Sequence, residues 1–262
     1  METLITLDNL TKSYGKHCVI DHISCDFRKG ESIAFTGHNG CGKSTLLKLM
    51  AGLIRVSSGR VSYKGKVRFS FVPEKFPAMD ISMTDYLYAI AKMEGRDTSE
   101  ADALIRDFFL DPMRHTRLSE LSKGSLQKVG VIQAFLTAAD VLFLDEPLSG
   151  QDAASQDVFI QKSNELREKG VTIFMSCHEK KLIDELSDRE YTIVNGKLYG
   201  RTDDSDVFYK VSVRKDDKLP LWEGMTDHGN KLVLRVKRDA LKETVMKLYN
   251  EGWELSGIEE YI

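Results

Sequence analysis

A glycine-rich stretch near the N-terminus, "GHNGCGKST" from Gly37 to Thr45, constrains this chain more than any other feature. It fits the pattern G-x-x-x-x-G-K-[ST], in which glycines let the backbone curl until successive N–H groups point at phosphate oxygens. The preceding "SIAFT" is typical of a buried strand, and the apolar residues that follow recur at helical spacing. The stretch therefore predicts a strand–loop–helix unit of an α/β fold that binds ATP or GTP.

Each position of this loop has a predicted contact. Lys43 would reach the β- and γ-phosphates and act in catalysis, and the Ser44 hydroxyl would bind Mg²⁺. The alternative is a glycine-rich turn followed by an ordinary surface lysine, and the flanking strand and helix argue against it. The other loop residues that we expect at the nucleotide are Gly37, His38, Asn39, Gly40, Cys41, Gly42 and Thr45.

A second motif, "VLFLDEP", supplies acidic side chains. Its apolar run from Val141 to Leu144 is typical of a central parallel strand, and ligands bind at the carboxyl ends of such strands. We therefore expect Asp145 to hold Mg²⁺ and Glu146 to take a proton from the attacking water. His178 follows a further predicted strand, "VTIFM", and we expect it to contact the γ-phosphate. A solvated acidic loop and a structural histidine are the alternatives.

Composition limits the other classes of function. The 262 residues carry a net charge of −3 and no run of lysine or arginine, which argues against nucleic acid as a partner. No apolar stretch reaches the roughly 18–20 residues of a membrane span, and the N-terminus does not resemble a signal peptide. The four cysteines lack metal-binding spacing and suggest reduced thiols. We therefore expect a soluble intracellular protein.

With these motifs in place, residues 1–200 resemble an ATP-binding cassette (ABC) ATPase. The stretch "LSKGSLQKV" is similar to the family signature, whose usual core is LSGGQ. The resemblance implies that this segment acts on the γ-phosphate of ATP held by a partner subunit, in a head-to-tail dimer. Lys123 and Ser125 depart from the usual residues, whereas Ser122 and Gly124 keep the groups that meet phosphate.

Further positions follow the family pattern or depart from it. Tyr14 in "TKSYGK" resembles the aromatic residue that stacks on adenine, with an ordinary half-buried tyrosine as the alternative, and His178 resembles the switch histidine. The segment "LSGQD" is similar to the loop that joins the two sites of the dimer, although Gln151 replaces the common leucine. Glu74 in "FVPEKFP" stands where glutamine is usual. Because a carboxylate also ligates Mg²⁺, we expect Glu74 at the metal, with an added negative charge beside the γ-phosphate.

The resemblance also implies a domain organisation. Residues 1–200 would form a P-loop core with a mainly parallel sheet, an antiparallel β-subdomain and a helical subdomain at about 78–123. Apolar spacing predicts helices at Asp85–Glu94 and Ser99–Leu110 in that subdomain, where a membrane permease would dock. Residues 201–262 would form a small accessory α+β region of order ββαβ. We expect its helix at Ala240–Tyr249, capped by Asp239.

The expected function is Mg²⁺-dependent ATP hydrolysis that powers transport through a separate permease. The chain would lie on the cytoplasmic face of the membrane, in a homodimer or in a heterodimer with another ABC ATPase subunit. Its compact layout, Glu74 and short tail resemble exporters, so we expect export. The main alternative is a soluble ABC ATPase of translation or DNA maintenance, which usually has tandem cassettes or long coiled coils. A kinase or GTPase would leave the signature unexplained.

Overall fold

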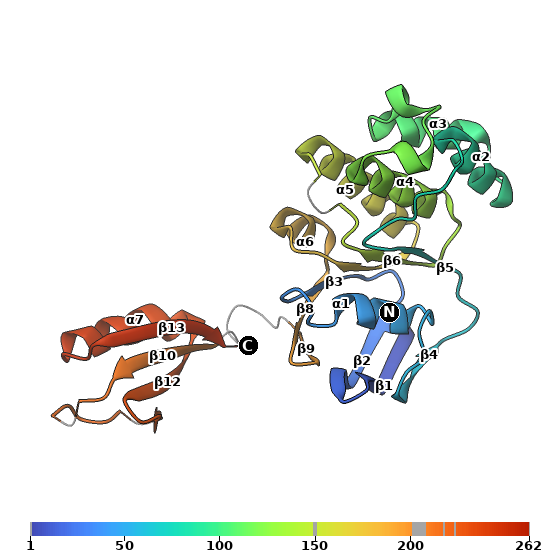
Figure 1. Cartoon of the computed structure of the whole chain (residues 1–262). Coiled ribbons are helices and arrows are strands. Elements are labelled where there is room, and N and C mark those ends of the chain that lie inside the picture. Colours follow the sequence, from blue (N-terminus) through green and yellow to red (C-terminus); the bar gives the residue numbers. More distant parts are fainter. Residues whose placement is uncertain (1, 149–150, 201–207, 217, 223, 262) are drawn as a thin grey trace. The chain divides into compact units, whose positions relative to one another are not determined.

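The chain divides into two compact units, Met1–Leu198 and Tyr199–Ile262 (Figure 1). The computed structural model describes residues 2–148, 151–200, 208–216, 218–222 and 224–261. Apolar side chains form two core clusters in the first unit and a third in the second unit. Each unit therefore has an apolar interior of its own.

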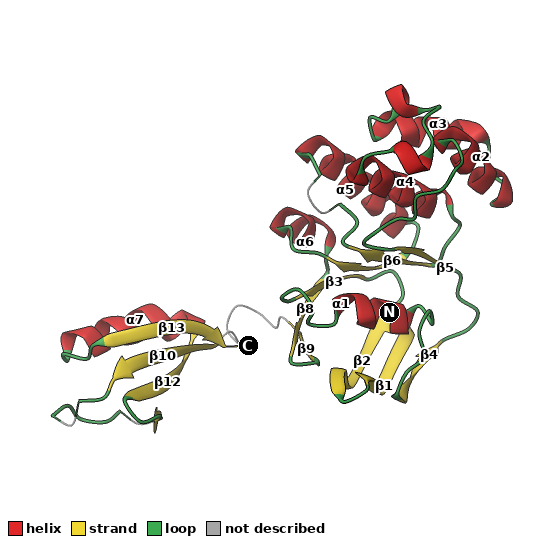
Figure 2. Ribbon diagram, viewed as in Figure 1, coloured by secondary structure: helices red, strands yellow, loops and turns green. Residues whose placement is uncertain are grey.

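A six-stranded sheet runs through the first unit in the order β5-β6-β7-β3-β8-β9 (Figure 2). Its pairs from β5 to β8 are parallel, and every residue of β6 and β7 is buried. Because β3, β6 and β7 are neighbours, their carboxyl ends meet at one edge, where such sheets bind ligands. The six strands are β3 (Ser32–Thr36), β5 (Phe69–Val72), β6 (Val141–Asp145), β7 (Thr172–Ser176), β8 (Arg189–Val194) and β9 (Lys197–Gly200).

An antiparallel sheet of order β2-β1-β4 belongs to the same unit. Its strands are β1 (Thr3–Tyr14), β2 (His17–Arg28) and β4 (Ser58–Tyr63). The Phe27 ring of β2 meets Phe174 of β7 edge-on, with 5.0 Å between the ring centroids. Helix α1 (Lys43–Met50) contributes apolar side chains to the core cluster that contains Phe27 and Phe174. The helix after the phosphate loop is therefore anchored in the core.

Helices α2 (Met83–Met93), α3 (Thr98–Asp107) and α4 (Lys123–Leu136) group together at one end of the first unit (Figure 1). The first two begin earlier than the sequence predicts, because Ser82 accepts from Asp85 N and Asp97 accepts from Ser99 N as N-caps. Short 3₁₀ turns, Asp111–Met113 and Leu118–Glu120, lead into α4. The remaining helices are α5 (Ala153–Glu168) and α6 (Lys180–Leu186).

The second unit is a four-stranded antiparallel sheet of order β11-β12-β10-β13 with one helix, α7 (Arg238–Asn250). The short strand β11 is additional to the predicted ββαβ order, and α7 follows β12 without a loop, so the expected cap Asp239 lies inside the helix. The predicted polar joint at 201–206 lies outside the described residues. The strands are β10 (Phe208–Arg214), β11 (Met225–Asp227), β12 (Lys231–Lys237) and β13 (Leu255–Tyr261).

Candidate active site

The phosphate loop joins β3 to α1, and the space around Gly37 and Gly42 excludes side chains. Gly37, Gly40 and Gly42 have positive φ angles of 132°, 82° and 116°. A Cβ at Gly37 would lie 2.7 Å from Ile193 O, and one at Gly42 would lie 3.1 Å from Val19 O. Glycine alone adopts such backbone angles at no steric cost, so these positions favour a curled loop whose N–H groups can face an anion.

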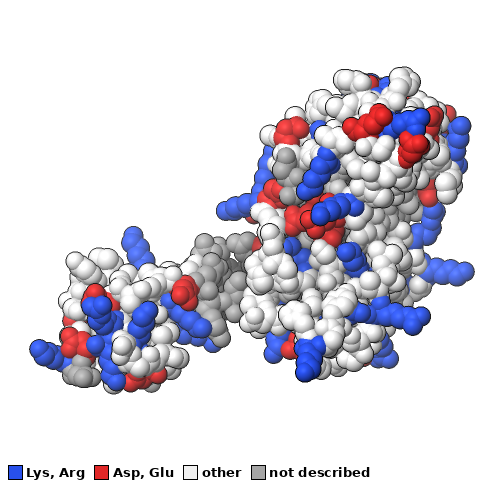
Figure 3. All heavy atoms as spheres, in the orientation of Figure 1, with Lys and Arg blue, Asp and Glu red and all other residues white. Residues whose placement is uncertain are grey.

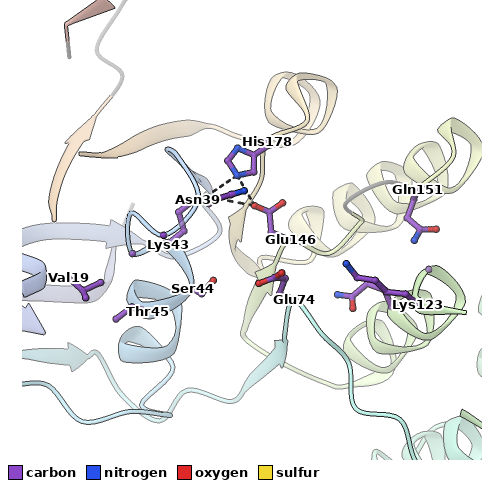
Figure 4. A pocket seen from close by; sticks show the side chains of 14 residues that line it. Val19, Asn39, Lys43, Ser44, Thr45, Glu74, Lys123, Glu146, Gln151 and His178 are labelled. Atoms are coloured by element: carbon purple, nitrogen blue, oxygen red, sulfur yellow. Dashed lines mark hydrogen bonds and ion pairs between the residues drawn. The ribbon is translucent and has the colours of Figure 1, made fainter. Parts of the chain in front are cut away.

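Lys43 begins α1, and its ammonium group lies among the other candidate residues (Figure 4). Its Nζ donates to Gly37 O at 2.9 Å and to His178 Nε2 at 2.9 Å, and lies 4.0 Å from Glu146 Oε1. Because the ammonium group is only a donor, His178 Nε2 carries a lone pair and the ring is neutral. Burial and the Lys43 charge also lower the pKa of His178. The contact between His178 and Glu146 at 3.2 Å therefore joins a neutral ring to a carboxyl group.

Asp145 ends β6, is 1% exposed and accepts two hydroxyl hydrogen bonds. Ser44 Oγ donates to its Oδ1 at 2.9 Å, and Ser176 Oγ donates to the same oxygen at 2.8 Å. A carboxylate beside a hydroxyl supplies the hard oxygen donors that Mg²⁺ prefers, so these residues fit the metal that the sequence implies. The described residues contain no group of three or more His, Cys, Asp and Glu suited to a metal. Such a site suits a metal that is also held by phosphate oxygens and water.

Glu146 has two unusual features. Its φ of 49° places a non-glycine residue in the left-handed region, and its N–H donates to Ser176 Oγ at 2.9 Å. The side chain is 13% exposed, and its Oε2 atom is buried and has no hydrogen-bond partner in the described structure. Burial, opposed by the Lys43 charge and reinforced by nearby carboxylates, raises the pKa of Glu146 to about 7. A carboxyl group of this pKa can take up a proton at neutral pH, as a general base must.

Lys43, Ser44, Glu146 and His178 line one cavity of about 700 Å³ (Figure 4). Figure 4 shows Lys43, Glu146 and His178 on one side, Lys123 and Gln151 on the other, and Glu74 between them. The cavity is lined by Val19, Asn39, Gly40, Gly42, Lys43, Ser44, Thr45, Glu74, Lys123, Gly124, Gln127, Glu146, Gln151 and His178.

Some predicted site residues are not among those that line this cavity in the described part of the chain. Tyr14 lies at the end of β1, is 54% exposed and has Lys12 Nζ at 4.8 Å from its ring centroid. Asp145 lies behind Ser44, to which it is hydrogen-bonded. The other residues outside the lining are Gly37, His38, Cys41, Ser122 and Ser125.

The predicted signature forms the N-terminus of α4. Ser122 is the N-cap, and its Oγ accepts from Ser125 N at 3.1 Å. The Gln151 side chain lies close over Gly124, where a Cβ would come within 2.7 Å of Gln151 Nε2. In the predicted loop between the two sites, Ser149 and Gly150 lie outside the described residues, and Asp152 caps α5 by accepting from Ser155 N. Action of this segment on a partner's ATP stays a prediction.

Three residues of the site were missed in the sequence. Ser176 holds Asp145, and its position at the end of a predicted strand is a signal that could have found it. Gln127 lies within the signature stretch, but nothing in its spacing marks it as a cavity residue. Val19 lines the cavity from β2, and its sequence environment carries no signal of that.

A phosphate loop at the carboxyl edge of a parallel sheet, with the acids Asp145 and Glu146 at the carboxyl end of β6, defines a P-loop nucleotide-binding protein. The particular family is that of ABC transporters, because the family model described as "ABC transporter" matches residues 20–149. An uncharacterized ABC transporter ATP-binding protein of Methanocaldococcus jannaschii is 34% identical, over 78% of this chain and 80% of the relative. This chain therefore belongs to the ABC transporter family.

Two further comparisons agree. The zinc import ATP-binding protein ZnuC of Hydrogenovibrio crunogenus is 31% identical, over 69% of this chain and 74% of that protein. The solved structure of an ATP-binding subunit of an ABC transporter superposes with a TM-score of 0.69 at 27% identity, covering 77% of this chain and 91% of the other. The predicted family, the α/β P-loop fold and the ATPase activity are thus confirmed.

The chain is an ATP-binding subunit of an ABC transporter, a class whose ATP-binding subunits work with membrane permeases. The alternative in translation or DNA maintenance gains no support from these relatives. Nor does the expectation of export, because the relatives whose names give a cargo include a zinc import protein. Within the described residues, none of the helices combines the length and the apolar character of a membrane span.

Proposed function

We propose that this chain hydrolyses ATP at the 700 Å³ cavity, with Glu146 as the general base. The phosphate loop would hold the β- and γ-phosphates, Lys43 would neutralise their charge, and His178 would contact the γ-phosphate. Ser44, Asp145 and Glu74 would hold Mg²⁺, which would offset the negative charge of the phosphates. The observation that carries this proposal is the Glu146 carboxyl group, whose buried Oε2 has no hydrogen-bond partner among the described residues and whose pKa is raised to about 7.

A Glu146→Gln substitution tests the proposal. The amide has the same size but cannot accept the proton of water, so ATP binding should persist while turnover falls by at least a hundredfold. The measurements are phosphate release and binding of a fluorescent ATP analogue, both with Mg²⁺. A variant that hydrolyses ATP at the parent rate would remove Glu146 from this role. Glu168→Gln, at the exposed C-terminal end of α5, is the control.

The remaining assignments complete a dimeric transporter subunit. We propose that Ser122, Lys123, Gly124 and Ser125 act on ATP held by a second subunit, as a homodimer or a heterodimer, and that Tyr14 stacks on adenine. The dimer would sit on the cytoplasmic face of the membrane, bound to a permease through the helical subdomain. Nucleic acid is not part of this proposal: on the face drawn in Figure 3, lysine and arginine side chains of the first unit are scattered among acidic ones.

The direction of transport has two candidates. Glu74 resembles the residue of exporters at this position, whereas the zinc import relative supports import. Inside-out vesicles that contain the chain with its permease separate the two, with Zn²⁺ as the first cargo tested. ATP added outside should make an exporter fill these vesicles and make an importer empty preloaded ones.

A further inference from the structure

The side chain of Gln127 hydrogen-bonds the loop that carries Glu74 to α4. Gln127 is 5% exposed, and both ends of its amide bond to the backbone of this loop. Its Nε2 donates to Pro73 O at 2.9 Å, and its Oε1 accepts from Phe76 N at 3.3 Å. The two bonded positions bracket Glu74 and Lys75, so a single amide spans the segment in which Glu74 projects into the cavity.

Among side chains of this size, an amide best suits the pair of hydrogen bonds to Pro73 and Phe76. The backbone offers a carbonyl at Pro73 and an N–H at Phe76, and glutamine carries one acceptor and one donor group in a single plane. Glutamate would keep the acceptor but would place a second oxygen against the Pro73 carbonyl. Leucine would leave both backbone groups without a partner in a buried setting.

The Phe76 ring holds the same loop against the same helix. Gly130 lies three residues after Gln127, on the same face of α4. A Cβ at Gly130 would come within 2.5 Å of Phe76 Cδ2, so the ring packs directly on the helix backbone. On its other side the ring meets Tyr86 of α2 edge-on, with 6.1 Å between the centroids. The loop is therefore anchored on α4 both before and after Glu74.

We propose that Gln127 is a positioning residue for Glu74: by bracketing the loop, it holds the Glu74 carboxylate at the point of the cavity where Mg²⁺ and the γ-phosphate are expected. This inference rests on the proposed metal role of Glu74. Figure 4 shows Glu74 between Ser44, on the phosphate-loop side, and Lys123, on the α4 side. Because α4 begins at the signature, Gln127 also ties the metal side of the site to the helix that starts at Ser122.

A merely structural role for Gln127 makes a different prediction. The loss of two hydrogen bonds in a buried site lowers stability, but such a loss alone leaves the metal requirement of the folded enzyme unchanged. The informative quantity is therefore the Mg²⁺ concentration that gives half-maximal ATPase activity. A positioning role predicts that this concentration rises, whereas nucleotide affinity in EDTA stays the same.

The experiment compares Gln127→Leu with Gln133→Leu in the full chain. Both glutamines lie on α4, but Gln133 accepts from the Tyr86 hydroxyl and does not line the cavity in the described structure. We expect Gln127→Leu to raise the half-activating Mg²⁺ concentration at least fivefold and Gln133→Leu to change it less than twofold. Should Gln127→Leu fail to fold, Gln127→Glu, which keeps the bond from Phe76, carries the same test.

A double-mutant cycle with Glu74→Ala decides whether Gln127 acts through Glu74. If it does, Gln127→Leu should have less than a twofold further effect on the Mg²⁺ requirement once Glu74 is alanine. Effects that multiply would overturn the inference, as would an unchanged Mg²⁺ requirement in Gln127→Leu. If Glu74→Ala itself leaves the requirement unchanged, the metal role of Glu74 in the proposed function fails, and this inference fails with it.

Discussion

At the scale of single residues, Glu146 combines backbone strain with an unfavourable electrostatic setting. Its φ of 49° is a conformation that costs of order 1–3 kcal/mol for a residue other than glycine. Its side chain is 13% exposed and lies beside Asp145, with Glu74 and Glu179 near enough to raise its pKa further. Both features lower the stability of the nucleotide-free chain, and both occur at the residue that we propose as the general base.

The raised pKa of Glu146 predicts how stability changes with pH. The carboxyl group titrates near 4.5 in the unfolded chain and at about 7 in the folded chain. Between these values the folded chain holds a proton that the unfolded chain lacks, so this group makes stability fall as pH rises. Glu146→Gln should therefore stabilise the chain at pH 8 by on the order of 1–3 kcal/mol, and the gain should vanish below pH 4.5.

Urea unfolding followed by circular dichroism measures this difference, in EDTA and without nucleotide. Both tryptophans, Trp222 and Trp253, lie in the second unit, so their fluorescence provides an internal control that should not respond to the substitution. The same stability difference at pH 4.5 and at pH 8 would contradict the proposed electrostatic cause.

Tyr14 leads to a prediction about the base of the nucleotide. Its ring is 54% exposed and has room to meet a ligand, and a π-face makes little distinction between bases. Tyr14→Ala should weaken ATP and GTP binding similarly, by about 1–3 kcal/mol, and Tyr14→Trp should be tolerated. Equilibrium titration with fluorescent ATP and GTP analogues tests this. Unchanged affinity in Tyr14→Ala would show that the ring makes no contact with the base.

At the scale of secondary-structure elements, α4 touches more of the site than any sequence pattern indicates. Its first turn carries the signature, Gln127 bonds to the Glu74 loop, and Lys128 Nζ lies 3.4 Å from Asp152 Oδ2. Two loops, those of Glu74 and Asp152, are therefore bonded to the helix that carries the signature. The helix itself is predictable from its apolar spacing, but these contacts depend on which loops the fold brings to it.

Two glycines of α4 give a matched stability test. Alanine gains up to about 1 kcal/mol of helix propensity over glycine, but at Gly130 its Cβ would overlap the Phe76 ring at 2.5 Å. Overpacking of this kind costs about 1–3 kcal/mol, so Gly130→Ala should be destabilising by on the order of 1 kcal/mol. At Gly124 the Cβ meets only the flexible end of Gln151, so Gly124→Ala should be neutral or slightly stabilising.

Urea unfolding of both variants without nucleotide compares the two effects. The Phe76 ring cannot easily move away, because it is buried between α4 and Tyr86. Gly130→Ala as stable as Gly124→Ala would mean that the loop of Glu74 adapts freely, which would also weaken the argument that it is firmly anchored on α4.

The sequence predicted those parts of the site that are local in the chain. The strand Ser32–Thr36, the loop after it and the acids after Leu144 are each marked by residues within a few positions of one another. Ser176 and Gln127 act on residues 31 and 51 positions away, so their roles exist only after folding. The predicted start of α7 was wrong, because Asp239 is a residue type that suits an N-cap, whereas the helix begins directly after β12.

At the scale of the whole molecule, the proposed function implies that each active site is built from residues of two subunits. The phosphate loop, Asp145 and Glu146 belong to one edge of the parallel sheet, whereas the signature begins α4. We propose that these two halves serve different ATP molecules in a dimer. The proposal then predicts that two inactive variants can restore activity to each other in a mixed dimer, which a site within one chain could not do.

Lys43→Ala and Ser122→Arg should each abolish activity as homodimers, because each damages both composite sites. In a mixed dimer, one site receives both defects, whereas the other combines the intact Lys43 of one chain with the intact Ser122 of its partner. Random exchange makes about half of the dimers mixed, each with one whole site, so about a quarter of the parent activity should return.

Phosphate release measures this recovery, and ATP-dependent dimerisation is followed in the same mixtures by size-exclusion chromatography. Each variant mixed with itself controls for residual activity, and differently labelled chains establish that subunits exchange. Dimerisation is the second measurement because strict cooperation between the two sites would suppress turnover while leaving ATP-dependent pairing intact. If exchange is complete but neither activity nor pairing recovers, Ser122 does not complete a partner's site, and the N-terminus of α4 must act within its own chain.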